Sequence, residues 1–527
     1  MLGLELVVVL GVCILASSVA AGRLRVAAPV LLVACGAALG FVPVFHEVSL
    51  PPEAMLLIFL PALLYWESLN TSLREIRTNL RPIVLLSTLL VLATAAAVAA
   101  VAHAMGLGWG PAWVLGAALA PTDATAVAAI ARGMPRRTTT ILRAESLIND
   151  GTALVIYAIA VSITVGEQEF SAGVISLRLL LSYAGGALAG LLVAWLAVQV
   201  RKRLDNPLQE TVTSILTPFA AFLLAEAVHG SGVIAVVTCG LTLARVGPRL
   251  VRADTRQVSY AFWGVATFLL NASLFVLIGL QANAAVRSLD SSEVLTAFGG
   301  IGLVALTVAG TRLLWGYTTP YVIRAVDRRP QQRLRRVGAR QRLASSAVSF
   351  RGAVSLAAAL AVPETVVDGG PFPFREEIIL ITSGVVVLTL IVQAVLLPTI
   401  IRVAQLPEDT ALEKEIQLAQ STASEEAFEA LPELADKVGA SDVVYKRVRA
   451  EYEHHLDVVR GKQAGDEEVA RSELEYTALR LELIAHKRAT VVRLRDEDAI
   501  DDIVLRTIQR KLDVEEVRLA RREVEDE

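Results

Sequence analysis

Ionisable and small polar side chains gather at three places inside stretches that are otherwise apolar. One place is Thr122-Asp123, a second runs from Glu145 to Asp150, and a third surrounds Arg351. An ionisable group inside hydrocarbon is costly unless it is paired or lines a water-filled cavity, so such groups mark functional sites. Each of the three places is therefore a candidate for chemistry.

The first place combines a helix breaker with a carboxylate. Pro121 removes a backbone donor and clashes with the preceding turn, so we expect the helix to break there and leave unpaired carbonyl groups facing a cavity. Thr122 and Asp123 would then lie where a second half-helix begins, a position that favours a capping oxygen and an anion.

The second place has the spacing of one helix face. Glu145 and Asn149 are four residues apart, as are Ser146 and Asp150, so their side chains lie on adjacent strips of a helix. Carboxylate, amide and hydroxyl oxygens are the ligands that hard cations prefer. Asp150 lies about 10 Å deeper than Arg143, which marks the helix end, at about 1.5 Å per residue. A site for a monovalent cation, with the aspartates Asp123 and Asp150 as its charged groups, is therefore predicted.

The third place contains an arginine within a polar stretch of an apolar span. An intramembrane arginine needs a carboxylate or carbonyl dipoles, and Glu145 is the natural partner for Arg351. Two other charged residues, Glu67 and Arg312, are nearer the ends of their spans and are expected to extend toward the membrane surface.

The elements that must position these residues are membrane spans. The chain is 54% hydrophobic and only 19% charged, which is typical of a polytopic membrane protein. About thirteen apolar windows are long enough to cross a bilayer, which takes roughly 17 to 25 residues. They cover approximately residues 2–21, 27–43, 53–70, 82–104, 112–131, 141–165, 174–200, 210–229, 231–247, 257–281, 292–318, 343–363 and 375–402.

The loops between the windows alternate in charge. Lys and Arg concentrate in one set of loops, the densest run extending from Arg324 to Arg342, whereas the opposite set holds only Arg178, Arg287 and Arg375. The positive-inside rule then places the N-terminus outside and the C-terminus in the cytoplasm of a multi-pass cell-membrane protein. The first window lacks a basic segment before it, so we expect an uncleaved anchor rather than a signal peptide.

The interrupted windows suggest an internal repeat. They are the fifth and the twelfth, seven apart, so two units of six spans joined by a linker helix would have opposite orientations. Inverted repeats whose broken helices cross at the midplane are an architecture of alternating-access transporters. After Pro407 the chain turns polar with helical spacing. We expect an all-α protein with a transmembrane domain over 1–403 and a cytosolic helical domain over 404–527.

The motifs together resemble the monovalent cation:proton antiporter superfamily, in the branch of bacterial NhaP-type antiporters and animal sodium/proton exchangers. The matching segments lie in the membrane part, about residues 1 to 402, and are Phe59 to Leu64, Ala120 to Asp123, Glu145 to Gly151, Thr217 to His229, and Arg351 to Leu356.

This resemblance implies an antiporter that exchanges sodium or lithium for protons, not an enzyme. It implies that Asp150 binds the ion and the proton alternately, that Thr122, Asp123, Ser146 and Asn149 complete the site, and that Glu145 pairs with Arg351. It further implies a homodimer in which a core domain moves like an elevator against a dimerisation domain. The expected partners are monovalent cations, protons and the lipid bilayer, with no nucleic acid and no cofactor beyond the transported ions.

The residue beside Asp150 bears on stoichiometry. Electrogenic relatives carry a second aspartate where this chain has Asn149, and an amide does not release a proton at ordinary pH. We therefore expect an electroneutral exchange of one cation for one proton.

Three other functions also use some of these features. Potassium/proton exchange within the same family stays open, because oxygen ligands alone do not select sodium from potassium. A membrane aspartyl protease also pairs two aspartates, but the Gly-x-Gly-Asp sequence is absent. A cation channel would need a carbonyl-rich glycine filter, and the sequence shows none.

Overall fold

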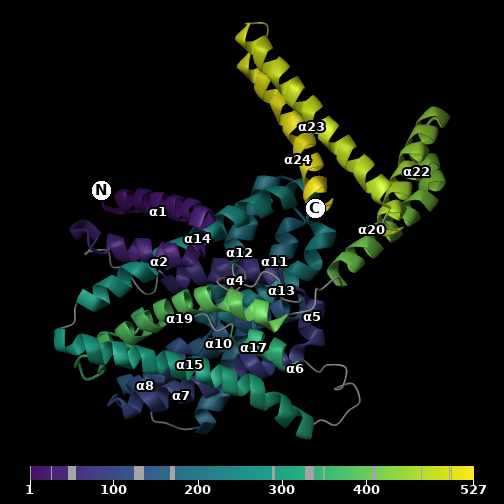
Figure 1. The fold of residues 1–527 in the computed structure, drawn as a ribbon. Coiled ribbons are helices and arrows are strands. Elements are labelled where there is room, and N and C mark those ends of the chain that lie inside the picture. The colour runs from purple at the N-terminus through teal and green to yellow at the C-terminus, as the bar shows by residue number, and fades with distance from the viewer. Residues whose placement is uncertain are drawn as a thin grey trace. The chain divides into compact units, whose positions relative to one another are not determined.

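A computed structural model describes most of the chain. The described residues are 2–24, 26–45, 55–123, 136–166, 172–287, 291–326, 338–347, 351–405, 411–464, 466–497, 499 and 501–526. The chain divides into two compact units, Met1–Glu408 and Asp409–Glu527. Regular structure within the described residues is helical (Figure 1).

The first unit contains helices of membrane-spanning length. Within the described residues, nine helical segments are long and apolar enough to cross a bilayer. They belong to α1 (Leu2–Leu24), η3 (Leu85–Leu90) with α7 (Val91–Ala104), α10 (Arg136–Val165), α11 (Ala172–Arg201), α12 (Pro207–Ala227), α13 (Gly232–Leu250), α14 (Ala253–Arg287), α15 (Ser291–Val326) and α19 (Arg375–Ala404). Two shorter apolar segments are α2 (Ala28–Leu39) and α4 (Leu60–Leu69), which continues from η2 (Met55–Phe59).

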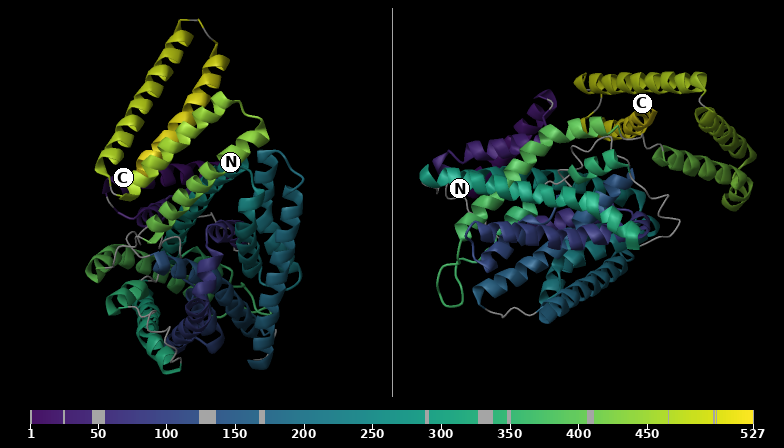
Figure 2. Two further views of the ribbon diagram at one scale, coloured as in Figure 1. Left: turned by 90° about the vertical axis from the view of Figure 1, so that its right-hand side faces the viewer. Right: turned by 60° about the horizontal axis from the view of Figure 1, so that its bottom comes forward.

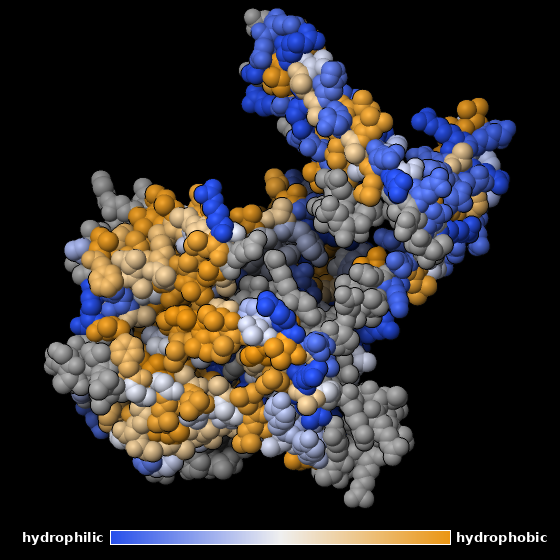
Figure 3. Space-filling model, viewed as in Figure 1, coloured by the Kyte–Doolittle hydropathy of each residue, from blue (hydrophilic) through white to orange (hydrophobic). Residues whose placement is uncertain are grey.

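The surface of this unit is apolar where its helices face outward. Large side chains such as Leu188, Leu306 and Val395 are about two-thirds exposed, which water would penalise and acyl chains would not. In the view of Figure 3, apolar residues cover wide areas of this unit. The unit is therefore suited to a lipid environment and spans the membrane several times.

Two expected spans are interrupted, at the places where the sequence predicted breaks. Helix α8 (Trp109–Leu119) ends before Pro121, and residues 121–123 are non-helical. The second half of that expected span, 124–131, lies outside the described residues. The other interruption separates α17 (Ala339–Ala347) from α18 (Ala353–Leu360), with residues 351–352 non-helical.

Glycines let neighbouring helices approach each other closely. A Cβ atom on Gly190 of α11 would lie 2.2 Å from the carbonyl oxygen of Ala235 on α13, and one on Gly186 would lie 2.5 Å from that of Ser231. Both distances are too short for any side chain, so the backbones of α11 and α13 touch. These two glycines therefore allow α11 to pack closely against α13.

Buried apolar residues form two large clusters that hold the candidate site between them. One joins α7, α8, α10, α15, α18 and α19, and the other joins α4, α11, α12, α13 and α14. Helix α10 contributes to both, through Ile156 and Tyr157 in the first and Leu147 in the second. The polar residues of α10 therefore lie in a rigid, densely packed setting.

The second unit consists of polar helices. They are α20 (Ala411–Glu429), α21 (Leu431–Val438), α22 (Asp442–Ala464), α23 (Glu467–Asp496) and α24 (Asp502–Asp526). Helices α23 and α24 run side by side as a hairpin (Figure 2), packed through Ile484, Leu512 and Leu519. Arg488 pairs across the hairpin with Asp513 at 2.7 Å.

Candidate ion-binding site

Helix α10 holds four polar residues that the sequence selected. Glu145, Ser146, Asn149 and Asp150 are all buried, with between 1% and 6% of each residue exposed. Their spacing along one helix places them on a common face, and that face meets the segment that follows α8. The structure thus brings the two pairs of residues spaced four apart to one place.

Thr122 is the hub that joins the α8 break to α10. Its Oγ1 accepts a hydrogen bond from Asn149 Nδ2 at 2.7 Å. The same oxygen lies 3.4 Å from Ser146 Oγ and donates to Glu145 Oε1 at 3.5 Å. One hydroxyl group therefore contacts three of the four polar residues of α10, and its position depends on the non-helical path that Pro121 imposes.

Two oxygens of neighbouring α10 residues have no hydrogen-bond partner among the described residues. They are Oδ1 of Asp150 and Oδ1 of Asn149. A buried oxygen without a donor is unfavourable by about 1 to 3 kcal/mol, so such groups in a native protein usually have a functional reason. A hard cation could bind both oxygens, whereas a proton would bind to the carboxylate of Asp150.

Asp123 lies directly against the start of α18. A Cβ atom on Gly352, the residue before that helix, would lie only 1.8 Å from Oδ2 of Asp123. The carboxylate therefore rests on the glycine backbone, next to the positive end of the α18 dipole. Only a glycine leaves room for it, which explains the residue type at the second interruption.

Arg351 places a positive charge at the C-terminal end of α8. Its Nε donates to the carbonyl oxygen of Leu119, the last residue of α8, at 2.8 Å. The guanidinium group is 1% exposed, and a cation at a helix C-terminus is favourable. Each interrupted segment thus supplies a charge to a half-helix of the other.

The structure pairs Glu145 with Arg312, whereas the sequence predicted Arg351 as its partner. Both oxygens of Glu145 accept from Arg312, from Nη1 at 2.5 Å and from Nη2 at 2.9 Å, and both side chains are buried. The reason is the length of α15, which continues to Val326 and so places Arg312 near the middle of its span rather than near an end. Two parallel hydrogen bonds from a guanidinium group bind a carboxylate more strongly than a single hydrogen bond does.

Glu67 is a residue that the sequence reasoning missed. It belongs to α4, and its charge acts on both Asp123 and Asp150. We expected it to extend toward the membrane surface, whereas the structure places it within electrostatic reach of the candidate site. The available signal was its type, because a carboxylate in an apolar span is a functional candidate by default.

Comparisons with known proteins agree with this geometry. Residues 7–403 match the family model described as the transmembrane sodium/hydrogen exchanger. The chain is 45% identical to an uncharacterised Na⁺/H⁺ exchanger of Mycobacterium tuberculosis, over 98% of this chain and 96% of that one. It is 33% identical to a Na⁺/H⁺ antiporter of Aphanothece halophytica, over 72% of this chain and 70% of that one.

The fold is also similar to a solved structure. The sodium proton antiporter MjNhaP1 from Methanocaldococcus jannaschii matches 76% of this chain and 99% of its own, with a TM-score of 0.57 and 19% sequence identity. This likeness concerns the fold alone. The family match across the membrane unit and the close relatives establish the class, and the chain belongs to the sodium/hydrogen exchanger family of membrane transporters.

Proposed function

We propose that this protein exchanges sodium or lithium for protons at a site formed by Asp150, Asp123, Thr122, Ser146 and Asn149. The observation that carries the proposal is the pair of buried oxygens, Oδ1 of Asp150 and Oδ1 of Asn149, which have no partner among the described residues. Asn149 is bonded to the Thr122 hydroxyl, where oxygen ligands from two segments converge, and Asp150 is the next residue on α10.

The exchange follows from the two species that one carboxylate can bind. A proton on Asp150 neutralises it and removes its affinity for a cation, whereas a bound cation keeps it ionised and excludes the proton. Glu145 does not compete for the ion, because Arg312 occupies both of its oxygens. Asp123 adds charge to the site from the end of α18.

The site further supports an electroneutral exchange of one cation for one proton. Asn149 donates to Thr122 and, as an amide, has no proton to release. With Asp150 as the exchanging group, the proton and the cation displace each other in turn, so no net charge crosses the membrane in a full cycle.

The larger-scale features of the proposal rest on family membership and on the fold. They are a homodimer, an elevator-like movement of a core domain against a dimerisation domain, inverted six-helix repeats, and a cytoplasmic C-terminus with the N-terminus outside. Each interrupted segment places a charged side chain at a helix end of the other segment. This arrangement supports a pair of inverted repeats whose broken helices cross.

Potassium/proton exchange is the second candidate. A relative from Bacillus pumilus, 31% identical over 70% of this chain, bears the name sodium, potassium, lithium and rubidium/H⁺ antiporter. Oxygen ligands of the kind found here do not by themselves reject the larger ion.

The test is ion-driven proton movement in proteoliposomes that contain the purified full-length chain. Addition of sodium or lithium should drive protons across the membrane, and Asp150→Asn should abolish this signal for every cation while the protein stays folded. The matched control is Asp205→Asn, because the Asp205 side chain is fully exposed. Wild-type exchange in Asp150→Asn would refute the proposal, and a response to potassium alone would favour the second candidate.

A further inference from the structure

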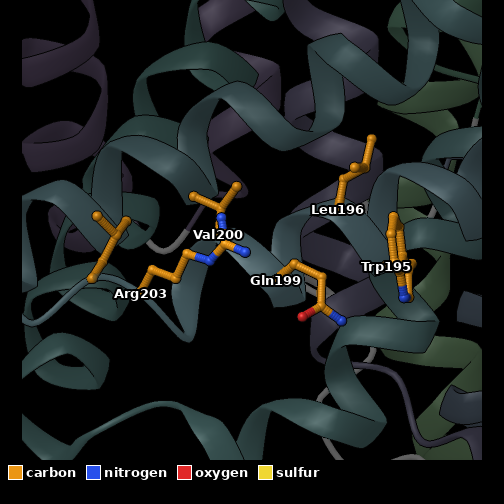
Figure 4. Close-up of a pocket in the computed structure, with 6 residues that line it drawn as sticks. Trp195, Leu196, Gln199, Val200 and Arg203 are labelled. Carbon is orange, nitrogen blue, oxygen red and sulfur yellow. The ribbon is translucent and has the colours of Figure 1, made fainter.

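A pocket at one end of α11 has the character of a lipid site rather than an ion site. It encloses about 550 Å³ and is lined by Trp195, Leu196, Gln199, Val200, Arg203 and Leu204 (Figure 4). The apolar members face outward, since Trp195 is 57% and Leu196 45% exposed. In Figure 4, Trp195 and Leu196 lie on one side of the pocket, and Arg203 lies on the other with Gln199 between them.

The positive charge at the polar end of the pocket belongs to Arg203. Arg203 has no acidic partner among the described residues. The nearby Asp205 lies 3.8 Å from Arg252 instead, and Arg201 points the other way, toward the hydroxyl of Tyr65 at 3.5 Å. A guanidinium group at the end of a membrane helix therefore remains available to an external anion.

The dimensions suit one leaflet of a bilayer. Trp195 lies six residues before the end of α11 at Arg201, which corresponds to about 9 Å along the helix, and Arg203 follows two residues beyond that end. One half of the hydrocarbon core is about 15 Å thick. An anionic head group at Arg203 would thus place its acyl chain alongside Val200, Leu196 and Trp195.

We propose that this pocket binds an anionic phospholipid, with its phosphate on Arg203 and Gln199 and one acyl chain along the apolar wall. Basic pockets at the ends of membrane helices recognise anionic head groups, and Arg binds phosphate through several donors at once. A free phosphate ion would leave the apolar wall unused, and a neutral lipid would leave the charge of Arg203 unmatched.

The experiment uses the full-length protein reconstituted in phosphatidylcholine with increasing fractions of phosphatidylglycerol whose acyl chains are brominated. Bromine quenches tryptophan fluorescence on contact, so the part of the quenching that is lost in Trp195→Phe reports occupancy of the pocket. We expect saturation of this part at a low fraction of the anionic lipid, and no saturation with brominated phosphatidylcholine.

The decisive comparison is between two neighbouring basic residues. Lys202 is exposed but does not line the pocket, so Lys202→Gln removes the same charge from the same surface. Arg203→Gln should lower the affinity for the anionic lipid by about tenfold or more, because a charge-assisted contact with the phosphate is lost. Lys202→Gln should lower that affinity by about twofold at most. Equal losses in the two variants would overturn the proposal in favour of unspecific attraction.

Two further outcomes separate the other occupants. Inorganic phosphate should not displace the lipid signal, and displacement would show a site for a free anion. The oligomeric state should be the same in Trp195→Phe as in the wild type. A shift of this variant to smaller species, together with absence of the lipid signal, would show that the pocket holds a second copy of the chain and would overturn the lipid proposal.

Discussion

Glu145 and Asp150 are carboxylates on the same helix, five residues apart, and both are buried, yet their surroundings differ. Glu145 receives two hydrogen bonds from Arg312. Asp150 keeps one oxygen without any partner among the described residues. Burial alone therefore does not mark an ion site, because a carboxylate must also be free to exchange its partner.

The largest effect is expected when the ion pair between Glu145 and Arg312 is disrupted. Glu145→Gln or Arg312→Gln should each destabilise the protein by about 3 to 5 kcal/mol, because an uncompensated buried charge or an unfilled set of donors remains. The double variant should lose much less than the sum. Unfolding measured in detergent by heat and by denaturant would show this.

The control for that cycle is Arg351, whose Nε donates to the Leu119 carbonyl oxygen. The pair Glu145→Gln and Arg351→Gln should show a smaller coupling energy than the pair with Arg312→Gln. A larger coupling to Arg351 would mean that the carboxylate belongs to the other arginine.

A smaller effect is expected from crowding Asp123. Gly352→Ala places a methyl group where the Asp123 carboxylate now lies, so the carboxylate must move away from α18. We expect a loss of about 1 to 3 kcal/mol in stability and a marked decrease in exchange rate. Gly264→Ala is the matched control, since nothing lies within 4 Å of its added methyl group. Normal exchange in Gly352→Ala would show that the position of Asp123 is unimportant.

Removing the free amide oxygen of Asn149 tests whether this oxygen binds the cation. Asn149→Ala deletes that oxygen and the hydrogen bond to Thr122, each a contribution of about 1 kcal/mol. The apparent affinity for the cation should decrease by roughly fivefold or more, while the rate at saturating cation persists. Asn70→Ala, which removes an exposed amide bonded to its own helix, should leave the affinity unchanged; a similar decrease there would contradict the assignment.

The membrane potential should have no effect on the balance point. If Asp150 alone exchanges its partner, a gradient of one pH unit, worth about 1.36 kcal/mol, balances a tenfold cation gradient at any imposed voltage. Reversal conditions in proteoliposomes clamped with a potassium ionophore would measure this. A balance point that moves with voltage would show a second titrating group, and Asp123 or Glu67 would be the first to examine.

The smallest effect is expected from the second unit. The Glu145 and Asp150 environments are built from the first unit alone, so a chain ending at Glu408 should still exchange ions. Loss of transport in a truncated chain that inserts normally would show that the polar helices take part in the transport path.

The sequence predicted the polar gathering more reliably than its pairings. Pro121, the spacing of four residues on α10 and the polar stretch at Arg351 are local features, and the structure brings them together at the two helix breaks. The partner of Glu145 could not be predicted, because hydropathy does not define where α15 ends and hence how deep Arg312 lies. The contact between Asp123 and Gly352 joins segments more than 200 residues apart and depends on how the two interrupted segments pack.

The contact between α10 and α13 has a consequence for movement. Beside Asp150, a Cβ atom on Gly151 would lie 2.9 Å from the end of the Ile234 side chain and 3.5 Å from Val233, so α10 presents a smooth surface there to flexible apolar tips. Contacts between apolar side-chain tips resist sliding only weakly. The two hydrogen bonds from Arg312 to Glu145 hold α15 to α10 much more firmly. The Glu145–Arg312 link therefore fastens α10 to α15 more firmly than the apolar contact at Gly151 fastens α10 to α13.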